Sequence, residues 1–162
     1  MTAFGIAILA FVTAQRLFEL WLADRNTKRL LANGAIEHGA NHYPLIVGLH
    51  SLWLAALWWL APGRAIDEFW LALFVLLQLG RLWVLATLGP RWTTRIIIPP
   101  GEPLVSAGPY RFVSHPNYWV VAGEIAALPL AFGLWAVALV FSLVNAFVLA
   151  IRIRAENRAL GR

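Results

Sequence analysis

The sequence predicts an all-α, multi-pass membrane bundle of about five helices, the last two of which form a helical hairpin. Of its 162 residues, 60% are hydrophobic and only 13% are charged, and the mean hydropathy is +0.70. Soluble domains carry about 25% charged residues. A soluble fold of this size could not bury nine Trp and nine Phe side chains, so lipid is expected to cover much of the surface.

Three apolar regions are predicted to be single spans. A helix needs roughly 20 mostly apolar residues to cross a hydrocarbon core, and we expect such helices at residues 2–22, 43–60 and 67–88. The second and third end at Pro62-Gly63 and Gly89-Pro90, pairs that break helices. The first lacks the positive amino-terminal region of a secretory signal, so we interpret it as a retained span.

The fourth apolar region, residues 118–151, is too long for one crossing. A straight helix of that length would measure about 51 Å. Pro129 and Gly133 lie near its middle, which favours a hairpin with arms of about 12 and 19 residues. The first arm is too short to cross alone, so its start is expected in a protein-lined pocket.

The distribution of basic residues predicts the same number of helices. Basic residues follow the first, third and last apolar regions, whereas the loop after the second offers only Arg64. Because basic loops stay in the cytoplasm, residues 89–117 and the C-terminus are expected on one side, separated by an even number of crossings. The N-terminus is then outside. We expect one membrane domain over residues 1–162, with three spanning helices in 1–88 and a polar loop and hairpin in 89–162.

Several classes of function are disfavoured by composition. The absence of Cys excludes disulfides, thiolate metal sites and cysteine nucleophiles. The net charge of +5 comes from basic residues scattered among apolar runs, which is typical of membrane-flanking charge and not of a nucleic-acid partner. Glu37, His38 and His42 have the ligand types for a metal, but Gly39 interrupts them, so we expect a polar surface loop and no metal site.

The polar, Pro-rich residues 89–117 are the best candidate for function in an otherwise apolar chain. Pro116 followed by apolar residues predicts the first turn of a helix, with His115 near its N-cap. The unpaired backbone N–H groups of such a helix start attract an anion. The alternative is a helix start that only anchors the chain at the membrane surface.

A second candidate group lies on the final helix. At about 100° per residue, Asn145, Arg152 and Glu156 fall within a stripe roughly 40° wide. Asn145 lies deep enough in an apolar run to need a partner, and Glu124 in the other arm is expected to face the bundle, either as a partner for an Arg or as a ligand contact. The alternative for Arg152 and Glu156 is an interfacial ion pair.

These motifs resemble the isoprenylcysteine carboxyl methyltransferase family. The resemblance covers about residues 85–160 and rests on Gly108-Pro109-Tyr110, on His115-Pro116-Asn117-Tyr118, on the hairpin that follows and on its Arg- and Glu-bearing end. It implies methyl transfer from S-adenosylmethionine to a lipophilic acceptor drawn from the bilayer, with residues 89–117 as the cofactor-binding loop. It places Arg152 and Glu156 at the reaction centre, and around the cofactor it places Leu104, Val105, Tyr110, His115, Pro116, Tyr118, Glu124 and Asn145.

The chain departs from the family pattern at two motif positions. Ser114 stands where the family usually has Arg before His-Pro, so a cationic contact is missing or comes from Arg111 or Arg95, and Glu156-Asn157 replaces a Glu-Glu pair. The acceptor oxygen is therefore left open between a carboxylate and a hydroxyl. The N-terminal half is more similar to small bacterial members thought to methylate hydroxyls of lipidic polyketides such as alkylpyrones.

Polar and aromatic residues inside the first three spans have simpler expected roles. Arg16 with Glu19, and Gln78 with Arg81, lie one turn apart, so we expect mutual pairing or a shared acceptor chamber. His50 is expected to bond to a neighbouring helix. An interfacial aromatic belt near the outer face is expected from Trp53, Trp58 and Trp59.

Two other functions remain open on sequence grounds. One is an NADPH-dependent membrane reductase resembling the sterol reductases, whose site should show extra cationic contacts for a 2′-phosphate. The other is a small helical scaffold, which does not need so long a polar segment. In each case the protein is expected in the cell membrane, and an enzyme site under the basic loops would face the cytoplasm.

Overall fold

Five α-helices account for most of the chain, as predicted. A computed structural model describes residues 3–161, so Thr2 and Arg162, which belong to the predicted first span and the basic C-terminus, lie outside the described residues. The helices are α1 (Ala3–Ala32), α2 (Tyr43–Leu60), α3 (Glu68–Leu88), α4 (Pro116–Ala131) and α5 (Trp135–Ala159). All except α4 are long and apolar enough to cross a membrane. The all-α membrane bundle is therefore confirmed.

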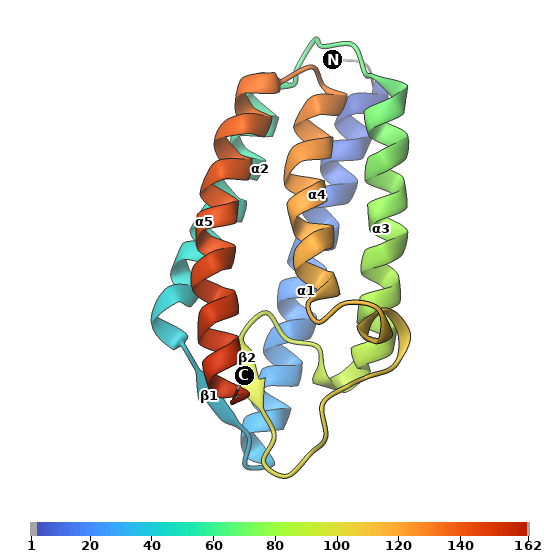
Figure 1. The fold of residues 1–162 in the computed structure, drawn as a ribbon. Coiled ribbons are helices and arrows are strands. Elements are labelled where there is room, and N and C mark those ends of the chain that lie inside the picture. Colours follow the sequence, from blue (N-terminus) through green and yellow to red (C-terminus); the bar gives the residue numbers. More distant parts are fainter. Residues whose placement is uncertain (1–2, 162) are drawn as a thin grey trace.

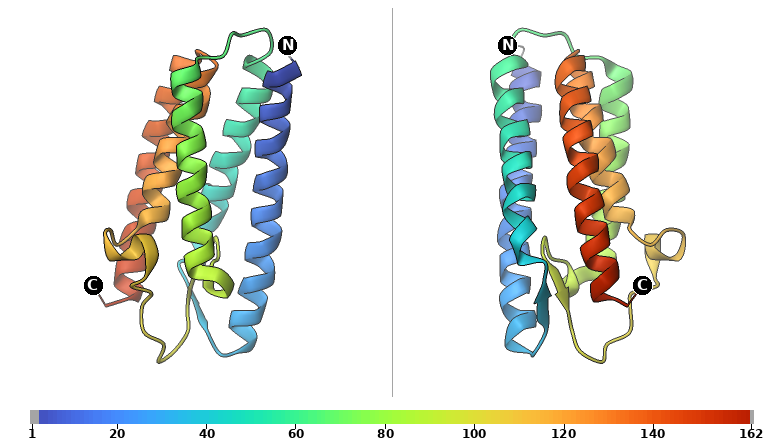
Figure 2. Two further views of the ribbon diagram at one scale, coloured as in Figure 1. Left: turned by 90° about the vertical axis from the view of Figure 1, so that its right-hand side faces the viewer. Right: turned by 60° about the vertical axis from the view of Figure 1, so that its left-hand side comes forward.

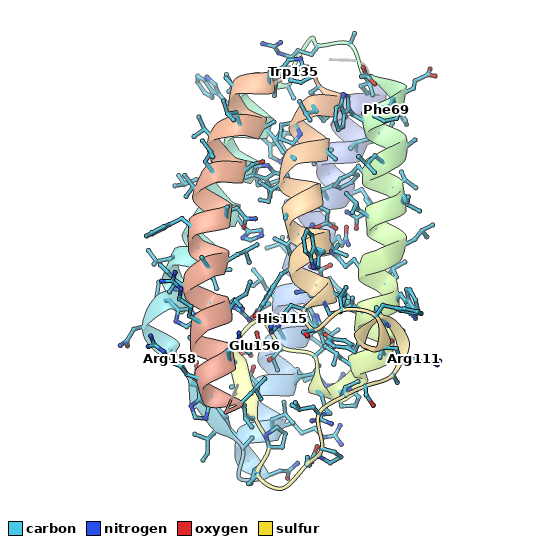
Figure 3. The ribbon with its side chains drawn as sticks, viewed as in Figure 1. Phe69, Arg111, His115, Trp135, Glu156 and Arg158 are labelled. Carbon is cyan, nitrogen blue, oxygen red and sulfur yellow. The ribbon has the colours of Figure 1, made fainter. Side chains whose placement is uncertain are left out.

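The helices run alternately up and down, so the connections gather at two ends (Figure 1 and Figure 2). The N-terminus, the α2–α3 loop and the α4–α5 turn lie at one end, and the C-terminus and the polar segment lie at the other. Phe69 and Trp135 mark the first end, and His115 and Glu156 lie towards the second (Figure 3). The polar segment and the C-terminus therefore share one side, as the charge distribution predicted.

Helix α1 continues about ten residues beyond the predicted end of its apolar span at Leu22. Residues 23–32 contain no Gly or Pro, and Asp24 pairs with Lys28 at 2.6 Å one turn further along. Asn26 donates a hydrogen bond to the Trp92 carbonyl at 2.8 Å, which ties this extension to the polar segment. The basic residues after the first span are therefore helical, because helix and membrane span need not end together.

The polar segment carries a short strand that the sequence analysis missed. Strand β1 (Ile36–His38) pairs antiparallel with β2 (Ile96–Ile98), with Glu37 opposite Ile97. Three residues are too few to show the alternation by which a strand is recognised. The remaining ordered turns are 3-10 helices: η1 (Ala40–His42), η2 (Gly89–Arg91) and η3 (Gly108–Arg111).

The C-terminal hairpin forms where it was predicted, with longer arms. Helix α4 has 16 residues and α5 has 25, against the expected 12 and 19 or so. The turn lies at Gly133, whose positive φ of 66° suits a residue without a side chain. Helix α4 buries ten of its residues and so lies at the centre of the bundle, which explains how a helix too short to be a span is accommodated.

Trp53 does not lie in the predicted interfacial belt. Its side chain is only 1% exposed, and its indole N–H donates to the carbonyl of Ile125 at 3.2 Å. Pro129, four residues later in α4, has no N–H to offer that carbonyl. Trp53 therefore supplies the hydrogen bond that the proline removes, which links α2 to α4 in the core.

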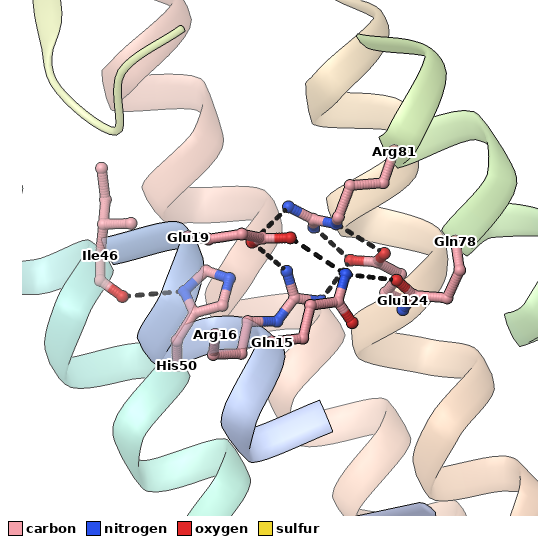
Figure 4. A network of polar contacts seen from close by, with 8 residues as sticks. All are labelled: Gln15, Arg16, Glu19, Ile46, His50, Gln78, Arg81 and Glu124. Carbon is pink, nitrogen blue, oxygen red and sulfur yellow. Dashed lines mark hydrogen bonds and ion pairs between the residues drawn. The ribbon is translucent and has the colours of Figure 1, made fainter. Parts of the chain in front are cut away.

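A buried network of charged and amide side chains joins α1, α3 and α4 (Figure 4). Glu124 is 1% exposed and accepts hydrogen bonds from Arg16 at 2.8 Å and from Arg81, whose Nε lies 2.8 Å away. Glu19 accepts from Arg16 at 2.8 Å and from Arg81 at 3.1 Å. Glu124 is thus an Arg partner, one of the two roles expected for it.

The pairing expected within α3 is wrong. Arg81 bonds to the carboxylates of Glu19 and Glu124, whereas Gln78 accepts from the Gln15 amide of α1 at 2.7 Å. Arg16 and Glu19 do pair within α1, as expected, at 2.8 Å. Interhelical partners prevail here because a buried guanidinium needs several acceptors that its own helix does not provide.

Removing Glu124 should destabilise the bundle strongly. In Glu124→Ala, Arg81 and Arg16 would keep their buried charges without this carboxylate, which typically costs about 3–5 kcal/mol. Asp24→Ala is the matched control, because its ion pair with Lys28 is exposed and contributes about 0–1 kcal/mol. Thermal unfolding of both variants in detergent checks this. Equal unfolding temperatures would contradict a structural role for the network.

Candidate active site

The start of α4 forms one wall of the candidate site. His115 is the N-cap residue and Pro116 the first helical residue, as predicted, and no side chain caps the free N–H groups there. The preceding turn η3 packs against α3. A Cβ on Gly108 would lie 2.3 Å from the Thr87 hydroxyl, and its φ is 55°. Gly108 is therefore required for η3 to sit against α3 and for the chain to enter α4.

Three polar side chains from α4 and α5 meet below this helix start. The Tyr118 hydroxyl donates to the Glu156 carboxylate and accepts from Arg152 Nε at 2.8 Å. His115 Nδ1 lies 3.7 Å from the other Glu156 oxygen, and the His115 ring stacks on Tyr118 with centroids 5.2 Å apart. Arg152 also donates to the Thr94 carbonyl at 2.7 Å, which fixes the polar segment against α5.

This cluster lines a pocket at the end of the bundle that carries the polar segment, which we call the outer pocket. Residues 88–118, the end of α1 and the last turns of α5 form its walls. Seven of the ten predicted site residues line it: Leu104, Val105, Tyr110, His115, Tyr118, Arg152 and Glu156. Residues more than fifty positions apart in the sequence therefore share one cavity.

The other three predicted site residues lie elsewhere. Pro116 is buried as the first residue of α4, next to the outer pocket. Glu124 belongs to the charged network within the bundle. Asn145 lines a second cavity, the inner pocket, which extends between α1, α2 and α5 and is bordered by apolar side chains such as Val148 and Leu149 together with several polar and charged ones.

The two pockets adjoin. Both are lined by Trp92, Thr93, Asn117, Tyr118 and Arg152. Arg16, Glu19 and Arg81 of the charged network border the inner pocket, whereas Gln78 does not. The cluster of Tyr118 and Arg152 consequently lies where the more polar outer pocket and the more apolar inner pocket meet.

The electrostatics of the outer pocket follow from burial and local pairing. Burial, and secondarily the nearby Glu156 carboxylate, raises the pKa of Tyr110 to about 12, so its phenol keeps its proton at neutral pH. The hydrogen bond that Arg95 donates to the Glu37 carboxylate raises the pKa of Arg95, which is already cationic at any relevant pH. The Arg95–Glu37 distance is 2.8 Å, so Glu37 serves as an ion-pair partner.

The cationic contact absent at Ser114 has candidates in the loop. Arg95 and Arg91 line the outer pocket, whereas Arg111, considered in the sequence analysis, is exposed and outside its lining. Arg91 donates to the Pro103 carbonyl at 3.1 Å and lies 3.6 Å from Glu102. Of the two predicted substitutes, Arg95 is therefore the one that lines the outer pocket, and Arg91, which also lines it, was not foreseen.

Asn117 is a site residue that the sequence analysis did not select. It lines both pockets, and its buried Oδ1 has no hydrogen-bond partner among residues 3–161. The signal was present, because Asn117 lies inside the His-Pro-Asn-Tyr run. Trp92, Thr93 and Thr94 were not selected either, because only folding brings the polar segment back against α5.

Comparison with known proteins identifies the family. The model of the isoprenylcysteine carboxyl methyltransferase (ICMT) family matches residues 70–162. The chain is 38% identical to the uncharacterized protein YpbQ of Bacillus subtilis, with 94% of each chain covered. It is 27% identical to an uncharacterized protein of Haemophilus influenzae, covering 93% of this chain and 91% of the other. No solved structure matches. With its apolar helices and this match over more than half of its length, the chain belongs to the isoprenylcysteine carboxyl methyltransferase family of membrane methyltransferases.

Proposed function

We propose that the protein transfers a methyl group from S-adenosylmethionine to an oxygen of a lipophilic acceptor at the cytoplasmic side of the cell membrane. The observation that carries this proposal is the junction of the outer and inner pockets at Tyr118 and Arg152. A polar cavity suits a donor that arrives from water, and an apolar cavity suits an acceptor that arrives from lipid. The family match supports methyl transfer as the chemistry.

The outer pocket has the features that such a donor requires. The uncapped start of α4 faces it through Ser114, His115 and Asn117, and free N–H groups at a helix start favour a carboxylate. The aromatic faces of Tyr110 and Tyr118 suit a sulfonium, because cations bind over aromatic rings. S-adenosylmethionine supplies an activated methyl group that is transferred by direct displacement. The residues present therefore fit this donor.

The chain's own residues would position the acceptor oxygen and handle its proton. Arg152 and the Tyr118 hydroxyl lie at the junction and can orient an oxygen there. A carboxylate acceptor needs no base and would pair with Arg152. A hydroxyl acceptor would lose its proton to Glu156 as the new oxygen–carbon bond forms and the sulfur–carbon bond breaks. Alignment of the two reactants and exclusion of water supply most of the acceleration.

The orientation in the membrane follows from the charges at the two ends. Arg25, Lys28 and Arg29 lie at the end of the bundle that carries the polar segment and the C-terminus, together with several further arginines. Arg64 is the basic residue of the α2–α3 connection at the other end. By the positive-inside rule the outer pocket would face the cytoplasm, where S-adenosylmethionine is available.

Ligand binding separates this function from the two alternatives. Titration calorimetry in detergent should show binding of S-adenosylhomocysteine and none of NADPH. The match to a methyltransferase family is the reason for this expectation, because it indicates a methyl donor and not a hydride donor. Binding of NADPH alone would favour the reductase, and binding of neither ligand would favour the scaffold.

Two substitutions test the outer pocket directly. His115→Ala and Glu156→Gln should each abolish donor binding or turnover and leave the protein in the membrane, because they remove the imidazole and the carboxylate that line the outer pocket. Glu68→Gln, in the first turn of α3 at the opposite end, is the matched control. Turnover measured with labelled donor and a lipid extract provides the readout. Full activity of either variant would exclude that residue from the site.

Tyr118→Phe separates positioning from donor binding. The substitution keeps the ring that stacks on His115 and removes the hydroxyl between Arg152 and Glu156. Loss of hydrogen bonds to charged groups costs about 1.5–3 kcal/mol, so kcat should fall about 10- to 100-fold while S-adenosylhomocysteine still binds. Thr87→Val, which removes a hydroxyl that donates to the Trp83 carbonyl at 2.8 Å and lines neither pocket, is the control. An unchanged kcat in Tyr118→Phe would refute the role of the hydroxyl.

A further inference from the structure

The inner pocket has a polar end, deep in the bundle, that the proposed methyl transfer does not use. His50 of α2 and Asn145 of α5 both line it, next to Arg16, Glu19 and Arg81 of the charged network. The rest of its lining within the helices is mostly apolar. Polar side chains at membrane depth are costly unless they are paired or functional. His50 and Asn145 are therefore expected to have hydrogen-bond partners.

His50 and Asn145 lie at the same depth on neighbouring helices. His50 precedes Leu60, the last residue of α2, by ten residues, and Asn145 follows Trp135, the first residue of α5, by ten. These helix ends lie together, because Arg64 beyond α2 donates to the Gly133 carbonyl before α5. Each residue is therefore about 15 Å from that end, and both line the inner pocket.

The Asn145 amide has no partner within the described chain. Its side chain is 2% exposed, and it makes no hydrogen bond to any other residue of 3–161. An amide offers two donors and an acceptor, and a buried polar group that stays unpaired is destabilising. Because Asn145 lines the inner pocket, a ligand there is the natural source of the missing bonds.

The His50 ring presents an acceptor to the same cavity. Its Nδ1 lies 2.8 Å from the Ile46 carbonyl of its own helix, not from a neighbouring helix as expected. A carbonyl can only accept, so Nδ1 carries the proton, and Nε2 of the neutral ring is an acceptor. In residues 3–161, Nε2 has no hydrogen-bond donor.

The charges beside these two residues cancel. The network contains the cations Arg16 and Arg81 and the anions Glu19 and Glu124, so its formal sum is zero. A carboxylate in the inner end would be an unbalanced charge and would face the lone pair of His50 Nε2. A hydroxyl can donate to His50 and accept from Asn145 at once.

We propose that the inner end of this pocket recognises an uncharged hydroxyl of the acceptor, held between Asn145 and His50. That this ligand is the methyl acceptor rests on the proposed function. Asn145 lies seven residues, or about two helical turns, from Arg152. The hydroxyl bound there is therefore a second polar group of the acceptor, distinct from the oxygen that is methylated, and Asn145 and His50 determine specificity by positioning the molecule.

Binding of simple lipids to the full chain in detergent, without any methyl donor, tests this inference. The probes are 1-hexadecanol, hexadecanoate and hexadecane, and the readouts are Kd and the shift in unfolding temperature. Hexadecanoate would pair with Arg152, so its binding should not depend on Asn145 or His50. Wild type should bind 1-hexadecanol about tenfold more tightly than hexadecane, because two hydrogen bonds are gained. Asn145→Leu and His50→Phe should remove that preference. Equal binding of 1-hexadecanol and hexadecane by wild type, or an unchanged preference in Asn145→Leu, would overturn the proposal.

Two further measurements keep the result interpretable. Asn145→Leu removes an unpaired amide at nearly constant volume, so its unfolding temperature should not fall; a fall would contradict the unpaired state of Asn145. Thr13→Val is the matched control, because its hydroxyl lines the same pocket but already donates to the Leu9 carbonyl at 2.7 Å. Failure of S-adenosylhomocysteine to bind, with the hexadecanol preference intact, would refute methyl transfer and leave the hydroxyl site standing.

Discussion

The buried pairing of Arg16 and Arg81 with Glu19 and Glu124 is the constraint on which the rest of the structure depends. Helices in lipid gain little from hydrophobic association with each other, because lipid is as apolar as their side chains. The positions of the helices along one another must then be set by polar contacts, which are satisfied in only one arrangement. Glu124 lies eight residues into α4, so fixing it against α1 and α3 also fixes the height at which α4 begins. The position of His115 and Tyr118 follows from that height.

The site is built where helix ends and a folded-back loop converge, and each part holds another in place. Arg152 illustrates this. It binds the Tyr118 hydroxyl of α4 and the Thr94 carbonyl of the polar segment, and it borders both pockets. Further along the segment, Arg95 pairs with Glu37 of β1. The loop wall of the outer pocket is thus fastened to α5 on one side and to the α1–α2 connection on the other.

The sequence was sufficient for features that depend on local chemistry. The limits of α2 and the start of α4 at Pro116 were predicted because proline, glycine and apolar length mark them directly. Partners across the bundle were a different matter. Trp53 donates to the carbonyl that Pro129 leaves without a helical partner, and Arg81 pairs with two carboxylates of other helices instead of with Gln78. Both contacts depend on which helices become neighbours. The two three-residue strands are too short to show a periodic pattern, so only their pairing with each other reveals them.

The junction between the two pockets determines how the proposed reaction would exclude water. Tyr118 and Arg152, which border both cavities, are already bonded to each other, and Tyr118 also binds Glu156. A reacting oxygen at the junction would therefore meet donors whose directions are fixed before it arrives, and preorganised groups need no rearrangement as charge develops. An acceptor that fills the apolar inner pocket would close the junction from the lipid side, and a donor in the outer pocket would close it from the aqueous side. The reaction would then be dry only when both ligands are present, which protects the activated methyl group from water until an acceptor is in place.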